Sequence, residues 1–336
     1  MTTISKLGLG LSVSLALSAP ALAHHSSAAF NTQQRITISG PITKYEFRNP
    51  HVYFTVQVKN ADGSTVLREV EAGAPSVLNP LGFTKESVKV GEMVSVQGNP
   101  ARNPADLMVL GLDLYKEDGT YLPLNIGSRS VYQVKNETAT SIAGTWFPTR
   151  QQFTSVMGAV GRWPTTPAAR GGRGGGATAT TQKDCIPIGT PVLMFYPVAN
   201  VITVQKDRVI INVDWMDSVR TVWLDGRKHP PATETSLHGH SIGRWEGDTL
   251  VVETTNFKEH AMGSSTALPS STQKKLTERF TLGADKKTLT ISGTVEDPVY
   301  LTAPGQFSGT WEYRPGMPQS NEKCDLETAL KFTKQP

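Results

Sequence analysis

Histidines near the start of the chain are the first residues whose types and positions could do chemistry. His24 and His25 follow Ala21-Leu22-Ala23, which matches the small-x-small pattern at which secretory signal peptides are cleaved. Cleavage there gives His24 a free α-amine beside its imidazole, and both groups are readily deprotonated near neutral pH. A second imidazole from His25 or His51 completes an all-nitrogen ligand set, which favours Cu(II). His24, His25 and His51 are therefore the candidate copper ligands.

The same histidines also have an explanation without a metal. Their arrangement is that of the histidine brace of lytic polysaccharide monooxygenases and periplasmic copper carriers, which this chain resembles only in beginning with histidine after cleavage. A His-His pair at a chain terminus is commonly a solvated tail, and His51 can cap the preceding turn by bonding Asn49. Cleavage one residue away would remove the α-amine ligand. Both interpretations stand at this stage.

A second set of polar residues with catalytic potential lies in the C-terminal half. Strand alternation places Glu278 on one face with Leu276 and Phe280, so its carboxylate lies among apolar neighbours. A buried carboxylate must be paired or protonated, because desolvation opposes its charge. The functional interpretation is acid–base catalysis, with a carboxylate as base and an imidazole beside it. The candidate catalytic residues are His238, His240, Arg244, Glu253 and Glu278.

The alternative for this set is structural. The same alternation places Glu253 on the face of Val251, inside the predicted barrel. Arg220 or Arg244 then pairs with a buried carboxylate and ties strands together. No nucleophile elbow, phosphate loop or HExxH motif accompanies the set, which favours the structural interpretation. His238-Gly239-His240 also presents two imidazoles on one face of a strand, although no third metal ligand is indicated by spacing.

The first residues predict export. Lys6 precedes an apolar run over residues 7–17 that is too short to span a bilayer, and a cleavage pattern follows it. Residues 1–23 are therefore predicted to be a signal peptide, and the mature protein is expected in the periplasm or outside the cell. No other segment resembles a membrane span. The formal net charge of +4 is too small to imply a nucleic-acid partner.

The two cysteines, Cys185 and Cys324, predict a disulfide because the chain is directed to an oxidising compartment. This bond would join the start of the second domain to the C-terminal region. Free thiols or a metal-binding pair are the alternatives.

The N-terminal part of the mature chain, residues 24–125, predicts a small β domain. Alternating apolar residues, a turn at residues 60–63 and one short helical segment indicate five strands with a helix between the third and the fourth. This order is typical of an OB-fold-like barrel. The expected strands are residues 36–47, 51–58, 65–71, 92–97 and 107–114, and the helix is 74–81.

A linker over residues 126–140 precedes a second, larger β domain over residues 141–336. A Gly-rich stretch at 162–182 indicates a disordered loop. Short connections between the later strands favour antiparallel order throughout, and closure into a barrel removes exposed edges. The chain is therefore all-β, with an up-and-down, lipocalin-like barrel after the OB-fold-like one. The eight expected strands are residues 201–205, 208–215, 219–224, 240–245, 249–256, 275–282, 288–296 and 307–313.

Three resemblances accompany these patterns. Ala23-His24-His25-Ser26, Asn49-Pro50-His51 and the segment 73–76 resemble an exported bacterial family of unknown function whose mature chains begin His-His-Ser. The sequence at residues 224–230 and 238–253 resembles a second group of uncharacterised exported bacterial proteins. This resemblance extends over residues 185–324. Gly144-Thr145-Trp146 is similar to the Gly-x-Trp that opens lipocalins. The first two resemblances imply periplasmic β domains and no activity.

These observations leave two main functional hypotheses. The first is an exported binding protein, with a small, partly apolar ligand in the C-terminal barrel and copper at the N-terminal histidine. The second is an exported enzyme, either copper-dependent and oxidative or acid–base in its chemistry. An accessory role with a protein partner in the cell envelope is a third alternative. The first hypothesis is favoured, because the sequence predicts a barrel that can hold a small ligand and histidines that can bind a metal. It contains no nucleophile motif.

Overall fold

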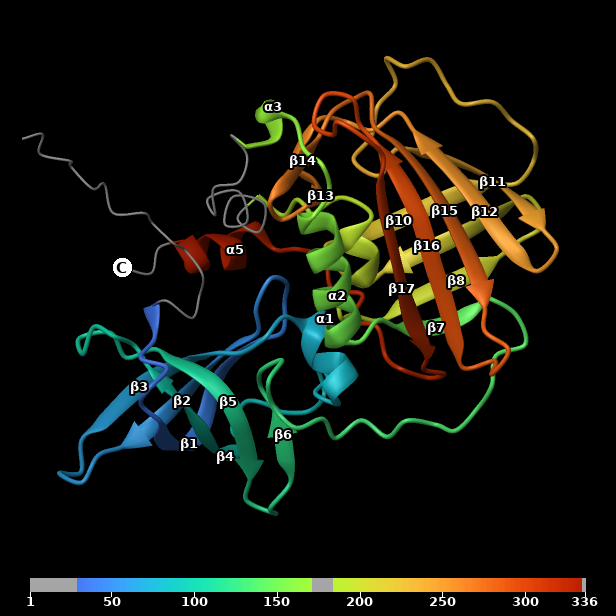
Figure 1. Ribbon diagram of the computed structural model, residues 1–336. Helices are drawn as coiled ribbons and strands as arrows, with labels where there is room; N and C mark the ends of the chain where they lie inside the picture. Colours follow the sequence, from blue (N-terminus) through green and yellow to red (C-terminus); the bar gives the residue numbers. More distant parts are fainter. Residues whose placement is uncertain (1–28, 171–183, 334–336) are drawn as a thin grey trace, which may run out of the picture.

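The computed structural model describes residues 29–170 and 184–333 and shows two closed β-barrels (Figure 1). Strands make up 42% of the described residues and helices 11%, so the predicted all-β class is confirmed. A five-stranded barrel forms the N-terminal part, and a nine-stranded barrel forms the C-terminal part. Within the described ranges, no helix is long and apolar enough to cross a membrane.

The first barrel has the strand order predicted for an OB-fold-like domain. Its sheet runs β3-β2-β1-β4-β5, and a parallel pairing of β3 with β5 closes it. A short helix, α1 (Pro75–Leu78), and the 3-10 turn η2 (Asn79–Leu81) follow β3, as expected. A sixth strand pairs with β5 outside the ring. The strands are β1 (Ile36–Glu46), β2 (Tyr53–Lys59), β3 (Thr65–Glu71), β4 (Met93–Pro100), β5 (Val109–Lys116) and β6 (Tyr121–Pro123).

Close approach of β1 and β2 explains the glycine that interrupts the apolar pattern of β1. A Cβ atom at Gly40 would lie 1.9 Å from the carbonyl oxygen of Gln57, so only glycine fits there. The β1–β2 register then shifts between Ile42 and Lys44, shortly after the Gly40-Pro41 pair, as is usual where these residues interrupt a strand. The core inside is apolar; its fully buried members include Val56, Val70, Val96 and Leu114.

The second barrel has nine strands, because a strand at Gly144–Phe147 joins the eight that follow residue 200. The order is β10-β11-β12-β15-β16-β17-β7-β8-β9, and β9 pairs with β10 to close the ring. The prediction of antiparallel order throughout is wrong at one place, since β10 and β11 run parallel. The strands are β7 (Gly144–Phe147), β8 (Asn200–Val204), β9 (Arg208–Val213), β10 (Ser218–Trp223), β11 (His240–Glu246), β12 (Thr249–Thr255), β15 (Lys275–Leu282), β16 (Thr288–Glu296) and β17 (Gly305–Tyr313).

The parallel pair has a physical reason in the length of its connection. Parallel neighbours need a crossover of a dozen or more residues, whereas antiparallel neighbours can be joined by a tight turn. Residues 224–239, called here the crossover segment, connect β10 to β11 and supply that length. The two strands share only two residue pairs, Val222 with Ser241 and Trp223 with Ile242.

Helical segments and aromatic side chains pack inside this barrel. The helix α2 (Arg150–Gly161) and the 3-10 turn η3 (Val192–Phe195) both contact the inward face of β17, at Gly309. The Trp311 indole donates a hydrogen bond to the Met194 carbonyl at 2.8 Å, which fixes the turn inside. Trp146, Phe195, Phe280 and Trp311 are fully buried. A barrel of this strand number is wide enough to hold them.

The segment predicted as a disordered loop over residues 162–182 is packed in its first part. Trp163 is buried, and its indole donates to the Gln306 carbonyl at 2.8 Å. A short helix, α3 (Pro167–Arg170), follows. Residues 171–182 lie outside the described residues, as do the predicted signal peptide and the candidate ligands His24 and His25.

Two smaller elements and an extended linker complete the fold. Strands β13 (His260–Ser265) and β14 (Leu268–Ser270) form a separate hairpin, and helix α5 (Leu326–Thr333) follows the last strand. The predicted linker, residues 126–140, bonds to both barrels through two backbone amides. Val131 N–H donates to the Leu81 carbonyl at 2.8 Å, and Ala139 N–H donates to the Lys286 carbonyl at 2.7 Å.

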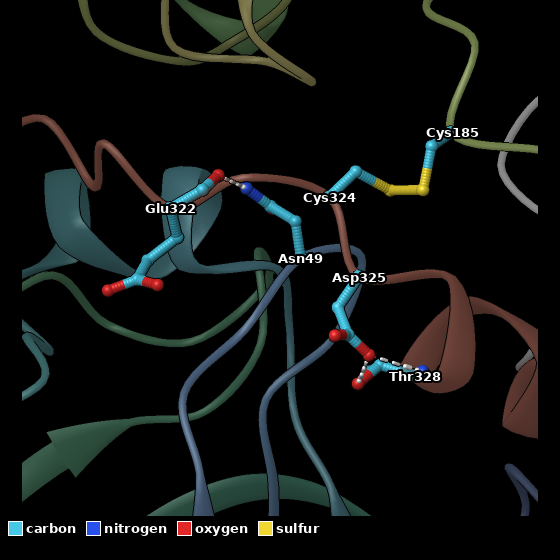
Figure 2. Close-up of a disulfide and its surroundings, with 6 residues drawn as sticks. All are labelled: Asn49, Cys185, Glu322, Cys324, Asp325 and Thr328. Atoms are coloured by element: carbon cyan, nitrogen blue, oxygen red, sulfur yellow. Dashed lines mark hydrogen bonds between the residues drawn. A yellow bond between two sulfur atoms is a disulfide. The ribbon is translucent and has the colours of Figure 1, made fainter.

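The disulfide between Cys185 and Cys324 forms as predicted, and it holds a segment that also binds the first barrel (Figure 2). The side chain of Asn49 donates to the Glu322 carbonyl at 2.5 Å, and Asp325 N–H donates to the Asn49 carbonyl at 2.9 Å. Asn49 is buried beneath this contact. Asp325 also caps α5 by accepting hydrogen bonds from Thr328. The disulfide and the Asn49 contacts together connect the two barrels.

Removal of the disulfide should lower the stability of the second barrel. The bond encloses a sequence separation of 139 residues, and loops of that size correspond to about 2–5 kcal/mol of stabilisation. We expect the double variant Cys185→Ser/Cys324→Ser to unfold at lower urea concentration than the oxidised protein. Reduced wild-type protein is the control and should match the variant. An unchanged unfolding midpoint in both would contradict this role.

Candidate functional site

His51 lies just before β2, with one ring nitrogen held by two oxygen atoms. Its Nδ1 lies 3.1 Å from the Ala72 carbonyl oxygen and 3.3 Å from Oε1 of Glu71. A carbonyl can only accept, so the proton of the neutral ring is placed on Nδ1. Metal-binding histidines usually donate one ring N–H to a carbonyl or carboxylate in this way, which orients the ring.

The surroundings of Glu71 are buried and negatively charged. The Glu71 side chain is fully buried, and the neighbouring Tyr53 is also buried. Burial, followed by the charge of Glu71, raises the pKa of the Tyr53 phenol well above its usual range. His51 is the only one of the three candidate copper ligands among the described residues. Across residues 29–170 and 184–333, no group of three or more His, Cys, Asp or Glu side chains is arranged to hold a metal ion.

Glu278 and Arg220 form an ion pair inside the second barrel. Arg220 Nη1 and Nη2 donate to the two carboxylate oxygens of Glu278 at 3.0 and 2.5 Å. Both side chains are almost completely buried. Arg220 Nη2 also lies 3.4 Å from Oγ1 of Thr254, which is bonded to Ser241. The carboxylate is thus placed inside the barrel, as its strand alternation predicts, and its partner is Arg220.

Glu253 and Arg244 lie on the outside of the barrel, so the prediction that Glu253 faces the interior is wrong. Arg244 Nη1 contacts Glu253 Oε1 at 2.7 Å, and their side chains are 56% and 48% exposed. Leu250, Val251 and Val252 are all buried, so β12 has no simple alternation at this point. The structure therefore separates Arg244 and Glu253 from Glu278.

The two histidines of the His-Gly-His sequence have different surroundings. Burial, then the positive charges of Arg220 and Lys274, lowers the pKa of His238 to about 4, so its ring is neutral at pH 7. His240 instead faces His229, with their Nδ1 atoms 3.0 Å apart. Burial and His229 lower the pKa of His240. The two imidazoles of the motif therefore do not form one metal site with a third ligand within the described residues.

A cleft of about 610 Å³ lies at one end of the second barrel, and we call it the end cleft. It is formed where β12 and β16 end, where the chain enters β15 and β17, and where the crossover segment passes. Its lining includes the apolar residues Pro230, Ala232, Pro298, Leu301, Ala303 and Pro304, and the polar or charged residues Thr255, Asn256, Gln273, Lys275 and Glu296.

Asn256 holds the crossover segment over this end of the barrel. Its side-chain amide donates to the carbonyl oxygens of Pro231 at 2.8 Å, Glu234 at 3.1 Å and Pro230 at 3.3 Å. The residue has a positive φ of 58°, a conformation that asparagine tolerates better than most residues. This single side chain therefore positions one wall of the end cleft.

Lys274 is a fully buried cation next to the end cleft that sequence reasoning did not identify. Its Nζ donates to the carbonyl oxygens of Thr190 at 2.5 Å and Gly263 at 2.6 Å, and lies 4.4 Å from the centre of the Phe257 ring. Burial lowers the pKa of the amine to about 7. The signal was present in the chain, because the alternation that carries Leu276 and Glu278 inward also includes Lys274.

In comparisons with known proteins, the N-terminal part of the chain is similar to an uncharacterised family. The pattern of a family of unknown function, DUF6152, matches residues 13–108. This match covers 96 of the 336 residues and includes β1 to β4. No curated protein matches the chain.

The buried ion pair should be much more sensitive to change than the exposed one. Glu278→Leu or Arg220→Met leaves an uncompensated charge in the core, at a cost of about 3–5 kcal/mol. The double variant Arg220→Met/Glu278→Leu should lose considerably less stability than the sum of the two. Urea unfolding measures each value. The matched control is Arg244→Met/Glu253→Gln, for which we expect a change within about 1 kcal/mol. Equal sensitivity of the two pairs would contradict the structural role.

Proposed function

We propose that the protein is an exported binding protein that holds a small, partly apolar ligand in the end cleft of its second barrel. The observation that carries this proposal is the cleft itself, of about 610 Å³. Small-molecule sites are usually concave, mostly apolar and furnished with a few polar groups, and their volumes fall in this range. The disulfide supports export, because such bonds persist in oxidising compartments.

The arrangement of the lining favours a ligand with one apolar part and one polar part. Pro230, Leu301 and Pro304 offer apolar contacts, whereas Lys275 and Glu296 lie opposite each other in the β15–β16 ladder and offer charges. The barrel interior is occupied by aromatic side chains and by η3. A ligand site at the end of the barrel is therefore better supported than one at its centre.

The acid–base alternative has less support from the geometry. Glu278 is fully engaged by Arg220, and the second candidate base, Glu253, lies on the outer surface with Arg244. A general base must reach the proton that it removes from a substrate. The pairing of both carboxylates favours binding over this form of catalysis.

We infer a second candidate function, copper binding at His51, because the ring is oriented by a carbonyl and a carboxylate. Ala29 and His51 belong to the same rim of the first barrel. Arg102 N–H donates to the Ala29 carbonyl at 2.8 Å. Next to it on this rim, the start of β5 pairs with the end of β3, and the end of β3 pairs with the start of β2, just after His51. The five residue-to-residue steps from His24 to Ala29 can extend at most about 18 Å.

A bulky substitution that fills the end cleft should weaken ligand binding. We expect the fluorescent probe 1-anilinonaphthalene-8-sulfonate to bind the folded protein saturably, and Ala303→Trp to weaken that binding at least about tenfold, because the indole occupies the cleft. Fluorescence titration measures both. Ala284→Trp, in the turn between β15 and β16, is the control with an equally bulky substitution and should bind as the wild type. Equal binding by the two variants, or none by the wild type, would overturn the proposal.

Copper binding should depend on His51. On exported protein whose N-terminus is verified as His24 by mass spectrometry, we expect one Cu(II) per chain by electron paramagnetic resonance. His51→Ala should lower Cu(II) affinity by at least about tenfold, since removal of even an outer partner of a ligand costs 10–100-fold. His229→Ala is the histidine control and should bind as the wild type. No copper uptake by the processed protein would remove this function.

A further inference from the structure

A second hollow, of about 450 Å³, lies where β10 and β11 separate, and we call it the β10 hollow. Because the two strands share only two residue pairs at the end of β10, Ser218–Thr221 have no ladder partner on that side. The end of the crossover segment, Ser236–Gly239, faces this gap. The hollow shares no lining residue with the end cleft; its lining includes Val219, Arg220, His238, His240 and Ser241.

Two buried nitrogen atoms of this lining have no hydrogen-bond partner among the described residues. Arg220 is buried and uses Nη1 and Nη2 for Glu278, but its Nε has no acceptor. Nδ1 of His238 likewise has none. Ser218, two residues before Arg220 and therefore on the same face of β10, has an unpartnered buried hydroxyl. Unsatisfied buried polar atoms are costly and rare, so the presence of two such nitrogen atoms in the lining of one hollow needs a reason.

The charges around the hollow favour an anion over a cation. Its lining contains one arginine, two histidines and no carboxylate. Burial lowers the pKa of His238 most, and the positive charges of Arg220, Lys274 and His260 lower it further. All of these charged neighbours oppose a further positive charge at the ring. A cation would meet the same opposition, whereas an anion would be attracted.

We propose that the β10 hollow binds the oxyanion group of a small molecule, through Arg220 Nε–H and the His238 ring. A neutral imidazole can carry its proton on Nδ1 and donate it to one oxygen, while the guanidinium Nε–H donates to another. The two Nη atoms keep Glu278 at the same time. Both nitrogens are covered by neighbouring atoms, so binding requires the partly exposed His238 ring to rotate and admit the group. A carboxylate and a phosphate share this chemistry.

The test uses the processed full-length protein with acetate and with inorganic phosphate, each against chloride at equal ionic strength. We expect saturable changes in the His238 ring resonances by nuclear magnetic resonance at pH 7, with the signals assigned by their loss in His238→Gln. A response to acetate alone identifies a carboxylate site, a response to phosphate alone identifies a phosphate site, and a response to both identifies a general oxyanion site. No saturable response to either anion overturns the proposal.

A matched pair of variants at the mouth of the hollow tests the charge argument without touching the core. Val219 is exposed and lines the hollow, so its substitution leaves the buried ion pair in place. Val219→Glu should weaken anion binding about tenfold by like-charge repulsion, whereas the nearly isosteric Val219→Gln should bind as the wild type. Both variants should melt within a few degrees of the wild type. Equal affinities for the anion would overturn the proposal even if the wild type responds.

Discussion

Closure of the second barrel through two residue pairs is the constraint on which its other features depend. Val222 and Trp223 of β10 meet Ser241 and Ile242 of β11 in parallel, so the chain between them must cross from one strand to the start of the next. The resulting crossover segment forms part of the end cleft and part of the β10 hollow. Asn256 fixes its course with three hydrogen bonds. Both hollows at this end thus follow from how the ring closes.

Charged side chains inside the barrel fix positions more than they add stability. A buried ion pair such as Arg220–Glu278 gains little over apolar residues of similar volume, because two charges must leave water. Its geometry, however, specifies how β10 is set against β15. Lys274 acts similarly on the loops, since its ammonium holds the carbonyls of Thr190 and Gly263 together. These contacts orient the elements around the end cleft.

The sequence predicted elements with strict alternation well and failed where alternation is absent. In β15 the inward series of Leu276, Glu278 and Phe280 is read directly, and the structure agrees. In β12 the three consecutive residues Leu250, Val251 and Val252 are apolar and buried, so alternation does not show which face points inward. The prediction that Glu253 faces the interior is wrong for this reason. The helix α2 contains two glycines, Gly158 and Gly161, which have weak helix propensity, and it is held by the packing of Val156 and Val160, which no local pattern reveals. The parallel direction of β11 could not be predicted either, because side chains alternate in the same way in parallel and antiparallel strands.

The contact between Asn49 and the segment around Cys324 has a thermodynamic consequence for the first barrel. Asn49 lies two residues before His51, and its amide and carbonyl are both bound by a segment that is covalently attached to the second barrel. A ligand at His51 that favours the docked position of this turn would also favour docking of the segment. Linkage then requires the reverse, with the same coupling free energy. If His51 binds copper as proposed, the two barrels would share one equilibrium, in which metal occupancy of the first barrel and attachment of the segment from the second barrel are reciprocal variables.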